Sequence, residues 1–372
     1  MLVGVPKEIK NHEYRVGMPP ASVREMVRHG HGVLVETGAG AGIGAGDDEY
    51  AAAGATIAGA PAEIFEKAEM IVKVKEPQAN ERAMLREGQL LYTYLHLAPD
   101  PEQTRDLIKS GATCVAYETV TSPLGGLPLL APMSKVAGRM SIQAGAYCLE
   151  HPHGGLGMLL GGVPGVDPAK VVILGAGVVG THATHIAVGM GADVWVIDNN
   201  LAALERNWSQ FGRGTNTVFS TEEAIEKHVL EADLVIGGVL IPGAEAPKLV
   251  SKKMVEAMKP GAVAVDVAID QGGCFETSRA TTHAEPTYVT GGVVHYCVAN
   301  MPGGVPRTST YALSNATLPF ALALADKGAK RALLDDPHLR NGLNVHAGMV
   351  THRKVAEDLG YEYVEAEAAL KK

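Results

Sequence analysis

Short runs of apolar, β-branched residues alternate with helical patterns along the first part of the chain. The segments ASVREMVRHG and PAEIFEKA are typical of helices. Strands are expected between and after them, at residues 33–36, 70–76, 90–97 and 113–120. Strands that alternate with helices in this way predict a parallel α/β sheet.

A second series of the same kind follows a helical segment at residues 134–150 and a glycine-rich loop. Its apolar runs are KVVILGAG, DVWVID, ADLVIGGV, AVAVDVAI, PTYVTGG and VVHYCVAN, and from Ser309 onward the pattern is helical. We expect two Rossmann-like α/β domains, each a parallel sheet with helices on both faces, and an active-site cleft between them. The last helices would pack back on the first domain. That domain would comprise residues 1–133 and 306–372, and residues 134–305 would form the second.

Composition narrows the class of protein. The 372 residues carry a net charge of −9 without a basic cluster, so nucleic acid and anionic membranes are poor candidates for partners. No apolar stretch reaches the roughly 18 residues of a membrane span, and the N-terminus does not resemble a signal peptide. The cysteines lie far apart, which fits neither a zinc site nor a small disulfide scaffold and favours the reducing cytoplasm.

The most specific motif lies in KVVILGAGVVGTHATHIAVGMGADVWVID. Gly175, Gly177 and Gly180 form G-x-G-x-x-G between an apolar strand and a helical pattern, and a second strand ends in Asp198. The first glycine permits a tight turn, the second lets the backbone approach a pyrophosphate, and the third allows close helix–strand packing. A carboxylate at Asp198 would bind the ribose hydroxyls and repel a 2′-phosphate, which favours NAD over NADP.

Other glycine and histidine clusters carry weaker signals. The segment ETGAGAGIGAGDDEY contains no G-x-G-x-x-G window, and its acidic residues would repel phosphate, so we expect a loop there. His182 and His185 are three residues apart on the expected pyrophosphate helix, which suits metal ligands, but no third ligand is evident. The pair His151 and His153 in a glycine-rich loop is an equally weak metal candidate.

Three basic side chains in the first domain have two interpretations each. Lys73 and Lys75 share one face of an apolar strand, so they are either solvated lysines on an edge strand or ammonium groups that meet a substrate anion. Arg15 lies in a polar loop after the first strand, where it is either surface charge or a two-point carboxylate ligand.

The segment LYTYLHLAPD, read as a strand, places Tyr92, Tyr94 and His96 on one face, with the histidine near the carboxyl end of the strand. His96 is either a core histidine with satisfied hydrogen bonds or a proton acceptor beside a substrate.

In AVAVDVAIDQGG, Asp266 and Asp270 flank the end of an apolar strand. Asp270 is either a turn-forming residue or a carboxylate that faces the cleft.

Together these segments resemble one known family. MLVGVPKEIKNHEYRVGMPP, KVKEP, YTYLHLAPD, APMSKVAGRMS, VVILGAGVVG, VDVAIDQGG and VANMPGGVPRTSTYALSNAT are similar to alanine dehydrogenase, in the same order and over essentially the whole chain. The NAD-binding part of proton-pumping transhydrogenase shares several of them. The presence of both Lys75 and His96, without a membrane domain, favours the dehydrogenase.

The resemblance implies NAD-dependent oxidative deamination of L-alanine to pyruvate and ammonia, which is reversible, in a homohexamer. It implies that Arg15 and Lys75 hold the substrate carboxylate and carbonyl oxygen, and that His96 and Asp270 transfer protons. Tyr94 and Asn300 would line the same pocket. The residues that it implies for the cofactor, besides the glycines and Asp270, are Ser134, Val178, Val179, Asp198, Ser220, Val239, Leu240, Val267, Ile269, Arg279, Val298 and Met301.

The chain departs from the family pattern in two places. Position 203, near the adenosine, is often basic in the family and is Ala203 in this chain, so either Arg206 replaces that contact or the contact is missing. The family's magnesium-site residues are not recognisable in FALALADKGAK, so we expect no required metal.

Two rival functions remain at this point. One is a transhydrogenase-like subunit that exchanges hydride between nucleotides, which predicts a partner chain and no amino-acid turnover. The other is a catalytically silent NADH-sensing module, which predicts nucleotide binding without substrate oxidation.

Overall fold

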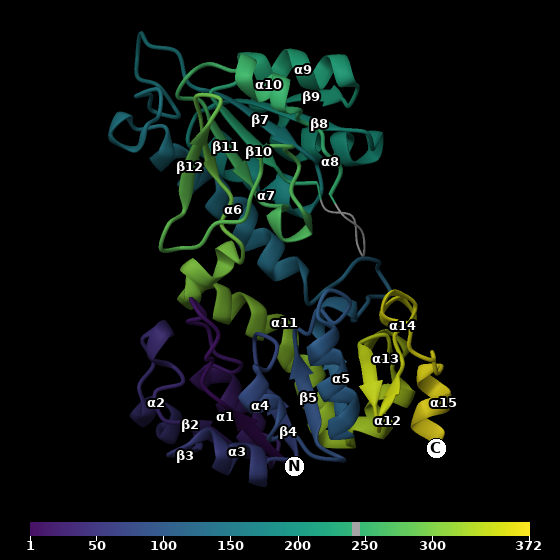
Figure 1. Cartoon of the computed structure of the whole chain (residues 1–372). Coiled ribbons are helices and arrows are strands. Elements are labelled where there is room, and N and C mark those ends of the chain that lie inside the picture. The colour runs from purple at the N-terminus through teal and green to yellow at the C-terminus, as the bar shows by residue number, and fades with distance from the viewer. Residues whose placement is uncertain (240–245) are drawn as a thin grey trace. The chain divides into compact units, whose positions relative to one another are not determined.

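The computed structural model describes residues 1–239 and 246–372, and the chain divides into two compact units (Figure 1). Unit 1 comprises Met1–Met133 and Gly303–Lys372, and unit 2 comprises Ser134–Pro302. Helix α6 (Ala131–Cys148) and the 3-10 helix η6 (Met301–Gly304) run across these boundaries. None of the helices in the described part of the chain combines the length and the apolar character needed to cross a bilayer.

Unit 1 is built on an eight-stranded sheet with the order β15-β14-β6-β5-β4-β1-β2-β3. The six strands from β1 to β6 are parallel and run in the order 3-2-1-4-5-6 of a Rossmann sheet, while β14 and β15 add an antiparallel edge. The strands are β1 (Leu2–Val5), β2 (Gly32–Glu36), β3 (Thr56–Ala58), β4 (Met70–Val72), β5 (Leu90–Thr93), β6 (Thr113–Ala116), β14 (Leu343–His346) and β15 (Met349–Val350).

Helices cover both faces of this sheet. Apolar residues of α3, α5 and α14 pack on one face, and on the other the hydroxyl of Tyr92 in β5 donates to the carbonyl of Thr317 in α11 at 3.3 Å. The helices of unit 1 are α1 (Pro20–Arg28), α2 (Asp47–Ala52), α3 (Pro61–Lys67), α4 (Ala79–Arg82), α5 (Pro101–Ser110), α11 (Pro306–Lys327), α12 (Ala329–Asp335), α13 (Pro337–Arg340), α14 (Arg353–Leu359) and α15 (Ala366–Lys371), with 3-10 helices η1 (Ala41–Ile43) and η2 (Tyr117–Thr119).

Unit 2 repeats the order of the first five strands in a seven-stranded sheet, which is β12-β13-β11-β10-β7-β8-β9. All neighbouring strands are parallel except β12 and β13, which form an antiparallel pair. The strands are β7 (Lys170–Leu174), β8 (Asp193–Asp198), β9 (Asn216–Phe219), β10 (Leu234–Gly237), β11 (Val263–Asp266), β12 (Thr287–Thr290) and β13 (Val293–Tyr296).

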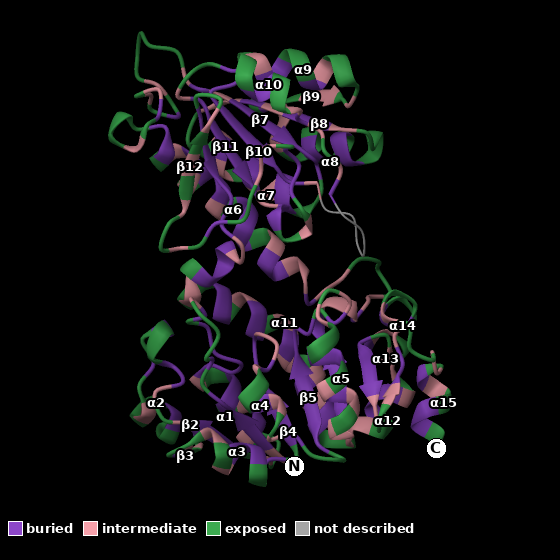
Figure 2. Ribbon diagram, viewed as in Figure 1, coloured by how far each residue is buried: buried purple, intermediate pink, exposed green. Residues whose placement is uncertain are grey.

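Alternate residues of the parallel strands of unit 2 face opposite helical layers. In β7, Val171 and Ile173 pack with α6, α7 and α8, whereas Val172 and Leu174 pack with α9 and α10 (Figures 1 and 2). This explains the continuous apolar runs, because a strand covered on both faces has no polar side. The helices are α7 (Val178–Gly189), α8 (Leu201–Phe211), α9 (Glu222–Glu231) and α10 (Lys252–Ala257), with η3 (His151–His153), η4 (Gly212–Gly214) and η5 (Ile269–Gln271).

The predicted fold of two α/β domains with mostly parallel sheets is confirmed, but several predicted elements are wrong. The strands expected to reach residues 76, 97 and 120 end at Val72, Thr93 and Ala116. Strands β14 and β15 replace part of the helical pattern expected after Ser309. The segment ETGAGAGIGAGDDEY, which we expected to be a loop, contains η1 and the start of α2, because Asp47 and the acidic residues after it favour a helix N-terminus.

Candidate functional site

The carboxyl ends of β1, β4 and β5 lie side by side in the sheet of unit 1. Sheet order reverses between β1 and β4, and ligands of open α/β sheets bind at such a switch point. The loop after β1 carries Arg15, the segment after β4 carries Lys75, and the segment after β5 carries His96. The topology therefore delivers a guanidinium, an ammonium and an imidazole to one edge of one sheet.

Arg15 is buried, so the interpretation as surface charge is wrong. Its Nε and Nη2 donate to the two carboxylate oxygens of Glu13 at 2.6 and 2.5 Å, and its Nη1 donates to Sδ of Met133 at 3.0 Å. Burial alone would lower the pKa of Arg15, but the hydrogen bonds and charge of Glu13 raise it above its ordinary value. The guanidinium is therefore permanently charged and held in one orientation.

The two lysines after β4 have different environments. Lys73 is fully buried and donates to Glu8 at 3.0 Å and to Glu81 at 2.8 Å. Burial by itself would lower the pKa of Lys73, but the two carboxylates raise it. Lys75 is half-buried, and its ammonium forms no ion pair with any residue in the described ranges. Because β4 lies between β1 and β5, the alternative of an edge strand with solvated lysines is wrong, and Lys75 is the ammonium available to a ligand.

His96 lies three residues beyond the end of β5, and its φ of 51° is left-handed. The expectation that Tyr92, Tyr94 and His96 share one face of a strand is therefore wrong. The backbone N–H of His96 donates to Glu118 at 2.6 Å, and the imidazole, 45% exposed, stacks on Tyr94 with the ring planes 8° apart. A positive φ is costly for a residue other than glycine, and such strain is concentrated at functional sites.

The ring of Tyr94 stacks against this imidazole. Its hydroxyl donates to the carbonyl of Leu129 at 2.5 Å, and its ring meets Tyr117 edge-on with centroids 5.1 Å apart. Burial raises the pKa of Tyr94, so the phenol stays neutral at physiological pH. Tyr94 therefore supplies a rigid surface rather than a proton to the site.

Sequence reasoning missed the carboxylates that hold these cations. Glu13 was not considered although it stands two residues before Arg15, and a lone acidic residue in a polar loop carries no distinguishing pattern. Glu8 and Glu118 come from segments 65 and 22 residues away from their partners Lys73 and His96. Only the fold brings such pairs together.

Unit 2 contains a pocket of about 410 Å³ at the carboxyl ends of β7, β8 and β10. Five of the residues expected to bind the cofactor line it, and so does Arg206, the basic residue considered as a replacement at Ala203. The pocket is lined by Leu174, Gly175, Gly177, Ile197, Asp198, Asn199, Asn200, Ala203, Arg206, Ser220, Gly238, Val239, Pro247 and Leu249. Leu240, also expected there, lies outside the described residues.

The three glycines of the motif differ in what they permit. Gly175 has a φ of +103°, which a side chain would strain. A Cβ at Gly180 would lie 1.7 Å from the carbonyl oxygen of Gly175, so only glycine lets α7 approach β7. A Cβ at Gly177 would meet nothing within 4 Å, which leaves open space beside the backbone at the start of α7. This arrangement fits a pyrophosphate against the N-terminus of a helix that begins with Val178 and Val179.

Asp198 ends β8 at the rim of this pocket. One carboxylate oxygen accepts from the backbone N–H of Ala176 at 2.6 Å, and the other accepts from that of Asn200 at 2.7 Å. The backbone N–H of Ser220 donates to the carbonyl of Asp198. Each carboxylate oxygen has further lone pairs, so the fixed carboxylate is suited to accept hydrogen bonds from ribose hydroxyls.

The loop after β11 carries Asp270, which is exposed in η5 beside Val267 and Ile269. Asp266 is buried, and burial raises its pKa despite hydrogen bonds from Ser278 and three backbone N–H groups. Lys248 caps the same loop from outside by donating to the carbonyls of Gly272, Gly273 and Phe275. Asp266 is therefore a structural residue, whereas Asp270 presents its carboxylate to solvent.

The remaining expected residues of unit 2 lie in α6 and around β12 and β13. Ser134 is half-buried in the first turns of α6, and Val298 and Met301 are buried after β13. Asn300 between them has a φ of 61°, and its carbonyl accepts from His283 at 3.2 Å. Arg279 stacks over the ring of Tyr288 at 4.0 Å.

In the first of the two histidine pairs, His182 is hydrogen-bonded to an arginine. His182 accepts from Nε of Arg139 at 3.1 Å, and burial together with Arg139 lowers its pKa to about 4. Within the described ranges, no three histidine, cysteine or acidic side chains converge in a metal-binding arrangement.

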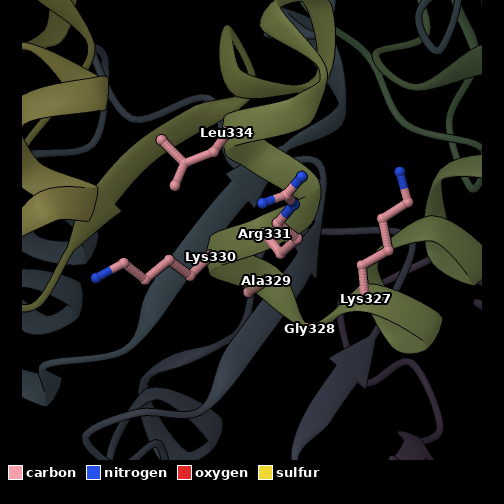
Figure 3. A pocket seen from close by; sticks show the side chains of 6 residues that line it. All are labelled: Lys327, Gly328, Ala329, Lys330, Arg331 and Leu334. Atoms are coloured by element: carbon pink, nitrogen blue, oxygen red, sulfur yellow. The ribbon is translucent and has the colours of Figure 1, made fainter.

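A second hollow, of about 440 Å³, lies at the junction of α11 and α12 (Figure 3). It is lined by Lys327, Lys330, Arg331 and three small or apolar residues, none of which was expected in a site. Lys327 and Arg331 both pair with Asp335, at 3.0 and 2.8 Å. Their charges are thus partly neutralised, and we assign no ligand to this hollow.

Two family models match the chain. The model described as Alanine dehydrogenase/PNT, N-terminal domain, matches residues 4–137, and the model described as Alanine dehydrogenase/PNT, C-terminal domain, matches residues 141–353. Similar curated proteins include an alanine dehydrogenase of Halomonas elongata, 60% identical over 98% of this chain and 99% of that protein. An alanine dehydrogenase of Bacillus subtilis (strain 168) is 56% identical over 100% of this chain and 98% of that protein.

Solved structures of the same family also match nearly the whole chain. A structure described as L-alanine dehydrogenase is 52% identical, with a TM-score of 0.94, and the match covers 97% of this chain and 99% of that one. A transhydrogenase from Sinorhizobium meliloti is 28% identical, with a TM-score of 0.81, and the match covers 95% of this chain and 99% of that one.

Proposed function

Because the chain belongs to the alanine dehydrogenase/PNT family, we propose that it is an L-alanine dehydrogenase that uses NAD. It oxidises L-alanine to pyruvate and ammonia, and in reverse it aminates pyruvate. The observation that carries this proposal is the placement of Arg15, Lys75 and His96 after neighbouring strands of one sheet. This edge offers two cations for a 2-oxo or 2-amino acid and one imidazole for its protons.

The first unit binds and orients the substrate. Arg15, which Glu13 orients through Nε and Nη2, binds the substrate carboxylate. Lys75 stabilises the negative charge that develops on the substrate oxygen, and Tyr94 shapes the pocket. The family resemblance adds Asn300 to the residues that we assign to the substrate.

We assign the transfer of protons during the reaction to His96 and Asp270. Bound NAD supplies the acceptor for the hydride that leaves Cα of alanine. Water then adds to the resulting imine, and the carbinolamine collapses to pyruvate and ammonia. Each of these steps moves a proton at nitrogen or oxygen of the substrate, and we assign the transfer of these protons to His96 and Asp270. The strained φ of His96 fits this role, because strain persists where the surrounding structure fixes a functional side chain.

The transhydrogenase alternative is weaker. The identity to the transhydrogenase is 28%, against 51–60% for alanine dehydrogenases over nearly the whole chain. A nucleotide-only function also leaves the buried Arg15–Glu13 pair and the available Lys75 without a role.

The resemblance also supports a homohexamer in the cytoplasm. All four cysteines are free and buried, which suits a reducing compartment. Sedimentation in solution tests the oligomer, since a hexamer has six times the mass of one chain.

The direct test of the activity is NADH formation from NAD and L-alanine at alkaline pH, followed by absorbance. We expect NADH, pyruvate and ammonia in equal amounts. A folded protein that binds NADH and forms no NADH from alanine would contradict the proposal, and it would favour the NADH-sensing module.

Cofactor choice should depend on Asp198. Asp198→Gly removes both the acceptor for the ribose hydroxyls and the charge that repels a 2′-phosphate. The ratio of kcat/KM for NAD to that for NADP should fall about tenfold or more, which corresponds to about 1.4 kcal/mol. Asp193→Gly is the matched control, because Asp193 begins the same strand and does not line the pocket. An unchanged ratio in Asp198→Gly would mean that another residue distinguishes the ribose.

A further inference from the structure

Three buried charges next to Lys75 have no part in the proposed mechanism. Lys73, Glu8 and Glu81 have side chains that are 0%, 2% and 2% exposed, and the ammonium lies between the two carboxylates. Burying three charges is expensive, because each loses its hydration. The cluster contains two acidic side chains and one lysine, so pairing with Lys73 alone does not account for the second carboxyl group.

Glu8 differs from Glu81 in what its carboxylate holds. Oε2 of Glu8 accepts from Lys73 Nζ at 3.0 Å, while Oε1 accepts from the backbone N–H of Val74 at 2.6 Å and, more weakly, from that of Lys75 at 3.4 Å. One carboxylate thus contacts three successive residues. Glu81 instead uses its other oxygen to cap α4, by accepting from the N–H of Gln78 at 2.7 Å.

The segment that Glu8 holds is the one that carries Lys75. β4 ends at Val72, so the N–H groups of Val74 and Lys75 lie beyond the last residue of the strand. On the opposite side of the segment, Thr93 donates its hydroxyl to the carbonyl of Lys75 at 3.1 Å. Hydrogen bonds to a carboxylate are about twice as strong as those between neutral groups. Glu8 and Thr93 therefore fix the backbone of Lys75 from two sides.

The loop of Arg15 is packed against the same place. A Cβ at Gly17 would lie 2.4 Å from the carbonyl oxygen of Val72, so this loop lies directly on the end of β4. Burial raises the pKa of Glu8, and the charge of Lys73 opposes that rise. Lys73 Nζ donates to Oε2 of Glu8 at 3.0 Å and is its counter-ion at this junction of the two substrate-binding segments.

We propose that Glu8 is a positioning residue that aims Lys75 at the substrate by holding the backbone of residues 74 and 75, with Lys73 as its counter-ion. This role rests on the proposed function, because it assigns Lys75 to the substrate. It also explains why only one of the two lysines after β4 is available to a ligand.

Glu8→Met and Glu81→Met form a matched pair for the test. Each variant leaves Lys73 in one buried ion pair, but only Glu8→Met removes the acceptor for the backbone of residues 74 and 75. We expect Glu8→Met to lower kcat/KM for alanine by about tenfold or more, which corresponds to about 1.4 kcal/mol, with NADH affinity unchanged. Glu81→Met should stay within about threefold of the wild type although it loses comparable thermal stability. Glu8→Gln, which keeps an acceptor oxygen, should recover part of the loss and substitutes for Glu8→Met if that variant does not fold.

A double-mutant cycle with Lys75→Ala separates positioning from general destabilisation. If Glu8 acts through Lys75, the change at Glu8 should cost less than about threefold once Lys75 is alanine. Equal losses in both backgrounds, or equal losses in the Glu8 and Glu81 variants, would overturn the positioning role. An active wild type with unaffected Glu8 variants overturns this inference alone. A folded wild type that does not oxidise alanine overturns the proposed function and the inference with it.

Discussion

Lys75→Ala should lose about 10²- to 10³-fold in kcat/KM for L-alanine while its affinity for NADH stays nearly unchanged. The magnitude is that of removing one preorganised donor from a developing oxyanion. The lysine lies in unit 1, and the pocket that contains the glycine motif is formed by residues of unit 2. The loss should therefore appear in turnover and not in nucleotide binding.

The measurement combines steady-state kinetics with a fluorescence titration of NADH. Lys67→Ala is the matched control, because Lys67 is an exposed lysine of the same unit whose ion pair with Glu63 lies on the surface. That variant should behave like the wild type. If Lys75→Ala loses NADH affinity in step with turnover, Lys75 is a structural lysine and the assignment is wrong.

His96→Ala should reduce kcat by about 10²-fold or more, within the range of general acid–base catalysis. The imidazole is exposed and stacked on Tyr94, and its backbone is held by Glu118, so truncation removes the proton acceptor with little loss of packing. The pH profile of kcat/KM should lose one ionisation. His153→Ala, another stacked histidine but in unit 2, serves as the control and should keep the wild-type profile.

Asp270→Asn distinguishes the second proposed proton carrier. The amide keeps the shape of the exposed side chain in η5 but cannot accept a proton from the substrate. This variant should bind NADH and lose alanine turnover. If it turns over alanine normally, Asp270 only forms a turn, and His96 acts with water. If His96→Ala keeps the wild-type pH profile, the imidazole has no catalytic role.

The fold was predictable because its signals are local. Apolar runs separated by helical patterns require sheets covered on both faces. The three motif glycines all lie at one strand–helix junction. The ends of strands were not predictable in the same way. Lys73 and Tyr94 continue the alternation of their strands, yet β4 ends at Val72 and β5 ends at Thr93. Just beyond these ends, the backbone N–H groups of Val74 and Leu95 donate to the carboxylates of Glu8 and Glu118, which come from other segments of the chain.

The residues of the site could be predicted from the sequence, but the partners that surround them could not. Without the family resemblance, the sequence favoured surface charge for Arg15 and did not distinguish Lys73 from Lys75. Glu13 and Glu8 decide both questions, since one buries and orients the guanidinium and the other takes Lys73 as its counter-ion. Strands β14 and β15 were not predicted, because two short antiparallel strands after a long helix contain too few residues to show a hydrophobic period.

The central claim is that a hydride passes directly from Cα of L-alanine to NAD. Incubation with α-deuterated L-alanine, followed by mass spectrometry of the nucleotide, tests it most directly. The account predicts that the reduced nucleotide carries the deuterium and that pyruvate appears in equal amount. Reduced nucleotide without deuterium, or none at all from a folded protein that binds NADH, would contradict it.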